Sequence, residues 1–253
     1  MTTIGVIYKK EDRLIAGTAQ QVIKELKRMG YRINLTGAKF VLTLGGDGTI
    51  LRSARILAKS RTPILGIHLG GVGFLSEIEL HELVEALELV KKGKYKLDER
   101  AMIEANVAGR KLVALNDIVI SNSGIARVIK LEVKGVAEYT SDGIIFSTAT
   151  GSTAYNLSAG GPLLTPESQS MVITAICPHS ISTRPLVVER AVTAALNRGK
   201  QAILTADGQQ LVALHERQKV RIQMSKLKTR FIRLKGYDFF GRVGEVFGFG
   251  PKV

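Results

Sequence analysis

The sequence predicts an α/β N-terminal domain with a parallel sheet, followed by an all-β, β-sandwich-like C-terminal domain. Up to about residue 95, apolar runs of strand length alternate with segments of helical periodicity, a pattern typical of a parallel sheet covered by helices. Beyond that point, short β-rich runs follow one another, separated by turn residues. We therefore expect an α/β domain at residues 1–95 and an all-β domain at residues 96–235. The glycine-rich aromatic tail, at about residues 236–253, is expected to pack back on the first domain.

The N-terminal elements begin with the strand-like run TIGVIY at residues 3–8. A helix is expected over residues 13–29, because apolar side chains recur there at helical spacing and Gly30 is a typical residue to end it. The remaining elements of this half are, in order, the strand-like runs YRINL and KFVLTL, a helix after Gly48, the strand-like run PILGIHL, and a helix over residues 79–92.

The C-terminal half consists of strand-like runs. RVIKLEVKG, at residues 127–135, alternates apolar and charged residues, as expected of a strand with one buried face. The other runs are IIFSTA, SMVITAI, PLVVE, QAILTA, QLVAL, KVRIQM and TRFIRL. Short strands that follow one another with turns between them predict a sandwich.

Composition limits the class of protein. Hydrophobic residues make up 45% of the 253 residues, enough for a substantial core, and the charged fraction of 23% is that of a folded protein. A single cysteine, Cys177, excludes an internal disulfide and favours a reducing, cytoplasmic location. The start, MTTIGVIYKK, does not resemble a signal peptide, and no apolar stretch approaches the roughly 18 residues of a membrane span. We expect no membrane partner.

The formal net charge of +14 has two competing explanations. A nucleic-acid-binding protein would use it for phosphate contacts, whereas an enzyme with phosphorylated substrates would use a part of it to hold them. Lysine and arginine are scattered along the chain, and aromatic residues make up only 6%. We therefore interpret most of the charge as solvated surface charge, and nucleic acid is not expected as a partner.

The motif GGDGT, at residues 45–49, lies between a predicted strand and a predicted helix. Backbone N–H groups at the start of a helix suit an anion, which assigns Gly45, Gly46 and Thr49 to phosphate binding. The motif matches neither the lysine-bearing phosphate loop nor the dinucleotide fingerprint. The carboxylate of Asp47 would repel a phosphate. It is useful there if it accepts a proton from an attacking hydroxyl, or holds a cation that bridges phosphates. Both roles belong to phosphoryl transfer.

Two further Asp-Gly pairs, Asp142-Gly143 and Asp207-Gly208, admit a hairpin turn as readily as a ligand contact. The first opens the stretch DGIIFSTATGSTAYNLSAGGP at residues 142–162, which gathers hydroxyl side chains around one tyrosine. An aromatic ring among hydroxyls is suited to stack on a base while the hydroxyls bind its edges. No Cys/His cluster is present, so no metal ligands are assigned.

Several motifs together resemble the NAD kinase family. GGDGT, LGGVGFL, ALNDIVIS, TGSTAYNLSAGGP and CPHSISTRPLVV occur in the order of that family, from about residue 40 to about residue 210. GGDGT also resembles lipid kinases of the diacylglycerol and sphingosine type, whereas TGSTAYNLSAGGP is far more specific. A lipid kinase remains one alternative, and a basic nucleic-acid-binding protein is another.

The resemblance implies phosphorylation of the 2′-hydroxyl of the adenosine ribose of NAD to give NADP. It implies ATP or polyphosphate as phosphoryl donor, Mg²⁺ as cofactor, and a homodimer or homotetramer. It makes Asp47 the general base. The substrate-binding residues that it implies are Gly48, Arg52, Asn116, Asp117, Arg127, Asp142, Thr153, Ala154, Tyr155, Asn156, Leu157, Ser158 and Gln209.

Two positions depart from the family pattern. Asp117 stands where many members have glutamate, so its carboxylate has a shorter reach. Thr140 stands where bacterial members commonly have arginine. Arg52 and Arg127 are the candidates to replace that charge.

Overall fold

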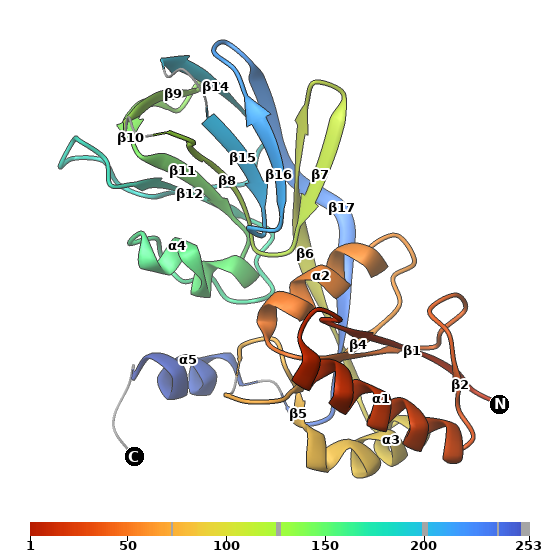
Figure 1. The fold of residues 1–253 in the computed structure, drawn as a ribbon. Coiled ribbons are helices and arrows are strands. Elements are labelled where there is room, and N and C mark those ends of the chain that lie inside the picture. Colours follow the sequence, from red (N-terminus) through yellow and green to blue (C-terminus); the bar gives the residue numbers. More distant parts are fainter. Residues whose placement is uncertain (72, 125–127, 199–201, 237, 249–253) are drawn as a thin grey trace. The chain divides into compact units, whose positions relative to one another are not determined.

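The computed structural model describes residues 1–71, 73–124, 128–198, 202–236 and 238–248 (Figure 1). The chain forms two compact units, one of Met1–Glu99 with the chain from Lys228 on, the other of Arg100–Leu227. We call them the first and the second unit. Strands β6 (Lys96–Val107) and β17 (Lys219–Arg233) belong in part to each. That the units match the domain boundaries expected from the sequence stays a prediction.

The sheet of the first unit is built from parallel pairs, as predicted. Its strands are β1 (Thr3–Tyr8), β2 (Arg32–Ile33), β3 (Val41–Leu44), β4 (Ile64–His68) and β5 (Ile78–Glu79). The order is β2-β1-β3-β4, with the C-terminal part of β17 and the short β5 also parallel to β4. YRINL contributes only two residues to the sheet.

Helices cover both faces of this sheet (Figure 1). They are α1 (Arg13–Arg28), α2 (Asp47–Leu57), and the 3-10 turn η1 (Leu80–Glu82) with α3 (Leu83–Lys91). A further helix, α5 (Phe239–Phe247), lies in the tail. Leu42 and Leu44 of β3 pack in one core with α1 and α3. Thr43, on the other face of the strand, donates its hydroxyl hydrogen to Ser53 of α2 (2.9 Å). Successive side chains of β3 therefore point alternately toward the two helical layers.

The topology brings two glycine loops to one edge of the sheet. In the pairing of β3 with β4, Leu44 lies opposite Ile67. The chain leaves β3 into the GGDGT loop and leaves β4 into a second glycine loop, which carries Gly70, Gly71 and Gly73. Ligands of parallel α/β sheets bind beyond this carboxyl edge.

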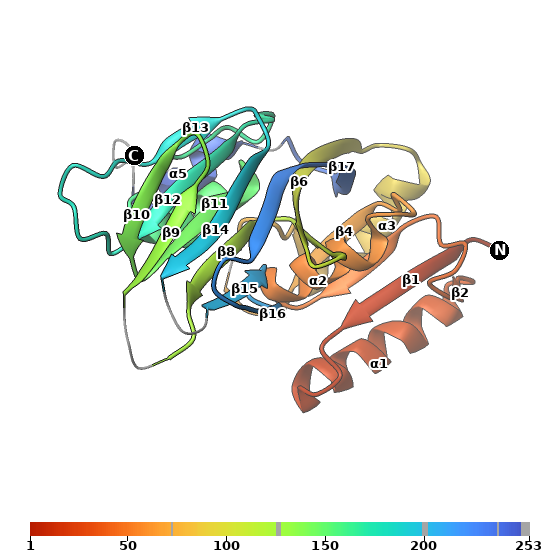
Figure 2. The same cartoon turned by 90° about the horizontal axis from the view of Figure 1, so that it is seen from above.

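The second unit is a sandwich of two sheets, as predicted (Figure 2). One contains β6, β7 (Arg110–Ala114), β9 (Ile129–Val133), β10 (Ala137–Ser141), β14 (Val192–Arg198) and the N-terminal part of β17. The other contains β8 (Asp117–Asn122), β11 (Gly143–Ser147), β12 (Met171–Ile176), β13 (Leu186–Val188), β15 (Ala202–Ala206) and β16 (Gln210–Leu214). A single core of alternate residues, such as Ile120 and Phe146 facing Leu131 and Leu196, lies between them.

Two details differ from the sequence prediction. KVRIQM and TRFIRL are parts of one strand of 15 residues, β17, because the residues between them include no glycine or proline to turn the chain. The C-terminal part of the chain also includes helical turns, η2 (Thr150–Thr153) and α4 (Tyr155–Ser158), within the serine- and threonine-rich stretch. Among the helices of the described residues, none is both long and apolar enough to cross a bilayer.

Candidate active site

The first glycine loop requires glycine for steric reasons. Gly45 has a φ of +135°, and a Cβ there would lie 2.8 Å from Thr49 Oγ1. Gly46 is the exposed N-cap of α2, and a Cβ built on it meets nothing within 4 Å. The N-terminal turn of α2 therefore begins beside open space, where its partial positive charge favours an anion.

The carboxylate of Asp47 is held by the backbone of the second glycine loop. The N–H of Phe74 donates to Oδ2 (3.0 Å), and the N–H of Leu75 donates to Oδ1 (3.2 Å). A Cβ on Gly73 would overlap Asp47 Oδ1, so glycine is needed for this close approach. Each carboxylate oxygen can accept more than one hydrogen bond. The carboxylate is thus oriented while it remains partly exposed.

The sequence predicts both glycine loops at the carboxyl edge of one parallel sheet, because each follows a predicted strand. It did not predict that Asp47 binds the second loop. The remaining predicted residues of the first loop are accessible to different degrees. Gly48 and Arg52 are exposed, and Thr49 is partly buried beside Gly45. An exposed guanidinium one helical turn after Gly48 adds positive charge near the start of α2.

The other predicted residues lie in the second unit, where Asp207 binds the segment that carries Asn116 and Asp117. Asp207 and Gly208 have φ values of +50° and +62° and form the tight turn between β15 and β16. The hairpin interpretation of this Asp-Gly pair is confirmed. The sequence analysis did not name Asp207 as a site residue, because an Asp-Gly turn has no signal that distinguishes a solvated carboxylate from a buried one.

The carboxylate of Asp207 binds the backbone at the start of β8. It accepts hydrogen bonds from the N–H groups of Leu115 (3.1 Å), Asn116 (2.8 Å) and Asp117 (3.4 Å). Because three backbone N–H groups donate to one buried carboxylate, the backbone that carries Asn116 and Asp117 is held in one orientation.

The side chains of this pair have unusual environments. Asp117 is only 6% exposed, and burial together with the negative charge of Asp207 raises its pKa to about 7. Asn116 Oδ1 is buried and has no hydrogen-bond partner within the described part of the chain. An unpaired buried acceptor costs about 1–3 kcal/mol, so this atom is suited to receive a donor from a ligand.

The turn η2–α4 places Tyr155 beside the acidic residues. Tyr155 is 45% exposed, and its pKa is raised by burial and by the negative charges of Cys177, Asp117 and Asp142. The structure thus brings together Tyr155, Asp117 and Asp142, three of the residues to which the family resemblance gives a part in dinucleotide binding. The exposed tyrosine ring is suited to stack on a planar group.

Asn156 has a different environment from its neighbour Tyr155. Its side chain is buried, and Nδ2 donates to the carbonyl oxygens of Ser152 (3.3 Å) and Pro162 (3.0 Å). Its Oδ1 accepts from the hydroxyl of Thr174 (2.7 Å). These contacts hold the turn against β12. Within the second unit, Asn156 therefore stabilises the conformation of the turn.

The remaining predicted residues vary in exposure. Thr153, Ala154 and Leu157 are partly buried, whereas Ser158 and Gln209 are exposed. Arg127 lies outside the described residues.

The Asp-Gly pair at residues 142–143 is not a hairpin. Asp142 is the single residue between β10 and β11, which belong to different sheets of the sandwich. Its N–H donates to the carbonyl of Ile176 (2.9 Å). The partly exposed Asp142 side chain therefore stands at a bend where the chain passes from one sheet to the other.

No group of three or more His, Cys, Asp or Glu side chains in the described part of the chain is arranged to hold a metal ion. This finding does not bear on a cation that arrives with a phosphorylated substrate. Mg²⁺ is commonly bound by one or two carboxylates together with substrate phosphates.

Comparison with known proteins identifies the family. Residues 7–95 match the ATP-NAD kinase N-terminal domain, and residues 115–234 match the ATP-NAD kinase C-terminal domain. The NAD kinase of Moorella thermoacetica is 38% identical over 276 residues, covering 97% of this chain and 89% of the relative. That of Syntrophotalea carbinolica is 42% identical over 225 residues, covering 84% of this chain and 79% of the relative.

Solved structures agree with these matches. An NAD kinase from Archaeoglobus fulgidus, in complex with ATP, is 29% identical with a TM-score of 0.77, and the match covers 98% of each chain. Yeast NADH kinase complexed with NADH shares the fold at 20% identity, with a TM-score of 0.88 over 100% of this chain and 89% of the other. With both family domains matched and relatives similar over most of its length, the chain belongs to the NAD kinase family of phosphotransferases.

Proposed function

We propose that this chain phosphorylates the 2′-hydroxyl of the adenosine ribose of NAD to make NADP, with ATP or polyphosphate as donor. The observation that carries the proposal is the Asp47 carboxylate, oriented by two backbone amides at the edge of a glycine loop in a member of this family. Family membership favours a dinucleotide over the lipid acceptor of the other kinases that share GGDGT.

Asp47 acts as the general base. The ribose hydroxyl gives its proton to a carboxylate oxygen, and the ribose oxygen forms a bond to the terminal phosphorus of the donor. The bond between that phosphorus and the bridging oxygen breaks, and ADP or a shortened polyphosphate leaves with the electron pair. The amides of Phe74 and Leu75 keep the carboxylate in one orientation, so little reorganisation is required when the proton moves.

The glycine loop and the N-terminus of α2 bind the donor phosphates. The backbone at Gly45, Gly46, Gly48 and Thr49 approaches them without interference from side chains, and the exposed Arg52 contributes charge. Mg²⁺ would enter with the donor, held by its phosphate oxygens, and would neutralise charge on the transferred group. Asp47 would supply the carboxylate of this loop for contact with such a complex.

The second unit binds the dinucleotide. The unpaired Oδ1 of Asn116 accepts a donor such as an amino group of a base, and Asp117 hydrogen-bonds a hydroxyl. Tyr155 stacks, and the other contacts are Asp142, Thr153, Ala154, Leu157, Ser158 and Gln209, with Asn156 supporting the turn. We also propose that the protein is cytoplasmic and assembles as a homodimer or homotetramer.

The test is an assay for NADP with purified protein, NAD and Mg²⁺, with ATP and polyphosphate in separate reactions. Asp47→Asn is expected to fold and to lose at least about 10²-fold in kcat, because the hydroxyl then lacks its proton acceptor. Asp12→Asn is the matched control. Asp12 also accepts two backbone N–H bonds at the start of a helix in the same unit, but its role is to cap α1.

Each outcome decides a separate part of the proposal. NADP formed by the wild type and by Asp12→Asn, but not by Asp47→Asn, supports both reaction and base. A near-wild-type rate for Asp47→Asn would overturn the role of the base. Absence of NADP with both donors would overturn the function.

A further inference from the structure

We propose that Arg233, at the end of β17, is a positioning residue for the Asp47 carboxylate and acts through the backbone of Leu75. This inference rests on the proposed role of Asp47 as the base. The sequence analysis named Arg233 only as part of the strand-like run TRFIRL, and its link to Asp47 runs through the backbone of Leu75.

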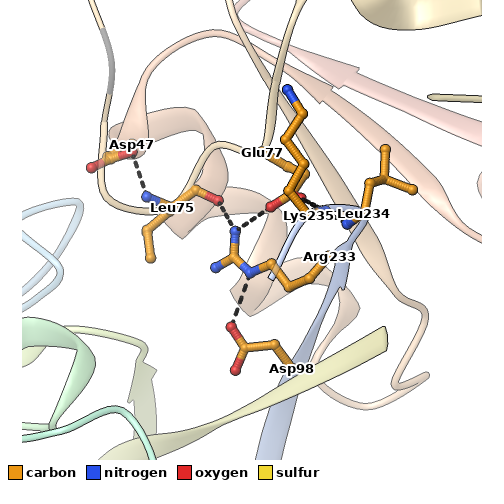
Figure 3. Close-up of polar contacts among 7 residues, drawn as sticks. All are labelled: Asp47, Leu75, Glu77, Asp98, Arg233, Leu234 and Lys235. Carbon is orange, nitrogen blue, oxygen red and sulfur yellow. Dashed lines mark hydrogen bonds and ion pairs between the residues drawn. The ribbon is translucent and has the colours of Figure 1, made fainter. Parts of the chain in front are cut away.

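Arg233 is a buried cation that binds oxygen atoms of Leu75, Glu77 and Asp98 in the first unit (Figure 3). Its side chain is 3% exposed. Nε binds Asp98 Oδ2 (3.0 Å), whereas Nη1 binds both Glu77 Oε2 (3.1 Å) and the carbonyl oxygen of Leu75 (3.3 Å). The guanidinium also lies over the ring of Phe231, with 5.1 Å to the centroid. Its position is therefore fixed from several directions.

Leu75 connects this cluster to the carboxylate. Its carbonyl accepts from Arg233, while its N–H donates to Asp47 Oδ1 (Figure 3). A residue bonded on both its N–H and its C=O has little freedom to rotate its peptide planes. The direction of the N–H that orients Asp47 is thus set partly by Arg233.

Glu77 ties the same loop to the end of β17. Its Oε1 accepts from the N–H groups of Leu234 (2.7 Å) and Lys235 (3.1 Å), and its Oε2 binds Arg233. Its own N–H donates to the carbonyl of Gly66 in β4 (2.9 Å). The loop that carries Leu75 is therefore fastened to two strands of the sheet just after the residue that binds Asp47.

The other side of the loop is fastened by the tail. The ring of Phe74, whose N–H binds Asp47 Oδ2, stacks on Phe247 of α5 with 5.3 Å between the ring centroids. Both amides that hold the carboxylate thus belong to residues with a distant anchor.

Stability alone gives a weak reason for this cluster. Burying an arginine with two carboxylates carries a desolvation cost, and well-packed apolar residues are often as stabilising or more so. The guanidinium differs from an apolar side chain because it donates in fixed directions. Here one of its N–H groups donates to the carbonyl of Leu75, as expected if Arg233 serves to orient that peptide.

The test compares Arg233→Lys with Arg230→Lys. Lysine keeps the charge and most of the length but loses the planar fork that reaches Leu75 and both carboxylates. Arg230 is the matched control, because it lies on the same strand and pairs with a neighbouring carboxylate, Glu99 (2.7 Å), on the exposed side of the unit. We expect Arg233→Lys to lower kcat about tenfold with KM unchanged, as a small displacement of a reacting group does. Arg230→Lys should keep the wild-type kcat.

Two further measurements separate positioning from folding. Backbone amide exchange in the peptide that spans residues 73–77 should be faster in Arg233→Lys than in Arg230→Lys, with the same exchange in α1. In the Asp47→Asn background, Arg233→Lys should cause no further loss of kcat, because it acts through the carboxylate that is already changed. If Arg233→Lys does not fold, the same measurements are made on Asp98→Asn, which loosens Nε and should lower kcat a few-fold.

The outcomes distinguish this inference from the proposed function. A wild-type kcat for the folded Arg233 variant, or an equal loss in both Asp47 backgrounds, would overturn the positioning role, while the reduced kcat of Asp47→Asn would still support the base. Full activity of Asp47→Asn would overturn the role of the base, and the positioning role with it.

Discussion

Asp47 and Asp207 are bound in the same way and differ in their exposure. Each precedes a glycine, and each accepts backbone N–H bonds from a segment distant in sequence. Asp207 is 9% exposed and has three such donors, so its oxygens are committed to the start of β8. Asp47 is partly exposed and has two, which leaves each oxygen able to accept a proton. Solvent access, more than hydrogen-bond chemistry, separates a structural carboxylate from one able to act as a base.

The largest expected effect of the buried site is a dependence of stability on pH, caused by Asp117 beside Asp207. The pKa of Asp117 is raised from 3.8 to about 7, so between these values the folded protein binds more protons than the unfolded chain. Its contribution to stability is therefore greatest below about pH 4 and is lost as the pH rises through about 7. We expect the unfolding free energy of Asp117→Asn, relative to wild type, to increase by about 2.5 kcal/mol from pH 5 to pH 8. Denaturant unfolding at both pH values measures this, and a constant difference would contradict the raised pKa.

Removing the charge of Asp207 should cost stability. Asp207→Asn keeps a residue that tolerates the positive φ but loses one acceptor for the amides of Leu115, Asn116 and Asp117. We expect a loss of about 2 kcal/mol in the free energy of unfolding, measured at pH 5, where Asp117 is protonated in the folded state.

Asp12→Asn is the control for this measurement, because asparagine caps an exposed helix as well as aspartate does. It should unfold as the wild type does. If both variants lost the same free energy of unfolding, the hydrogen bonds from the buried amides to Asp207 would contribute nothing extra to stability.

A methyl group beside Asp47 should lower the rate and spare the fold. The Cβ of Gly73→Ala would overlap Asp47 Oδ1, a side-chain atom that is able to move away. The displaced carboxylate then loses its bonds to Phe74 and Leu75, and we expect kcat to fall about tenfold with a change in melting temperature of only a few degrees.

Gly71→Ala is the control, because a Cβ at that position meets nothing within 4 Å. It should keep the wild-type kcat. Unchanged kinetics of Gly73→Ala would show that the carboxylate functions without its fixed orientation, and a collapse of both variants would point to loop flexibility instead.

Local pattern was sufficient to predict much of the architecture. Periodicity predicted α1 and the strands β1, β3 and β4, because amphipathic spacing and short apolar runs are local properties. It did not predict that KVRIQM and TRFIRL form one strand, or that TGSTAYNLS is helical. Serine and threonine occur in turns, in helix caps and at strand ends. The conformation of this stretch is therefore decided by tertiary packing around Asn156.

By itself, the sequence predicted most of the order of strands and helices, the place of the GGDGT loop at a helix start, and Asp47 as the candidate base. These follow from residue type and spacing along the chain. Only the tertiary structure decided that Phe74 and Leu75 orient Asp47, that Arg233 holds Leu75, and that Asp207 binds the amides before β8. Those contacts join residues 27 to 158 positions apart, and a hydrogen bond between such distant groups is specified by the packing of the sheet.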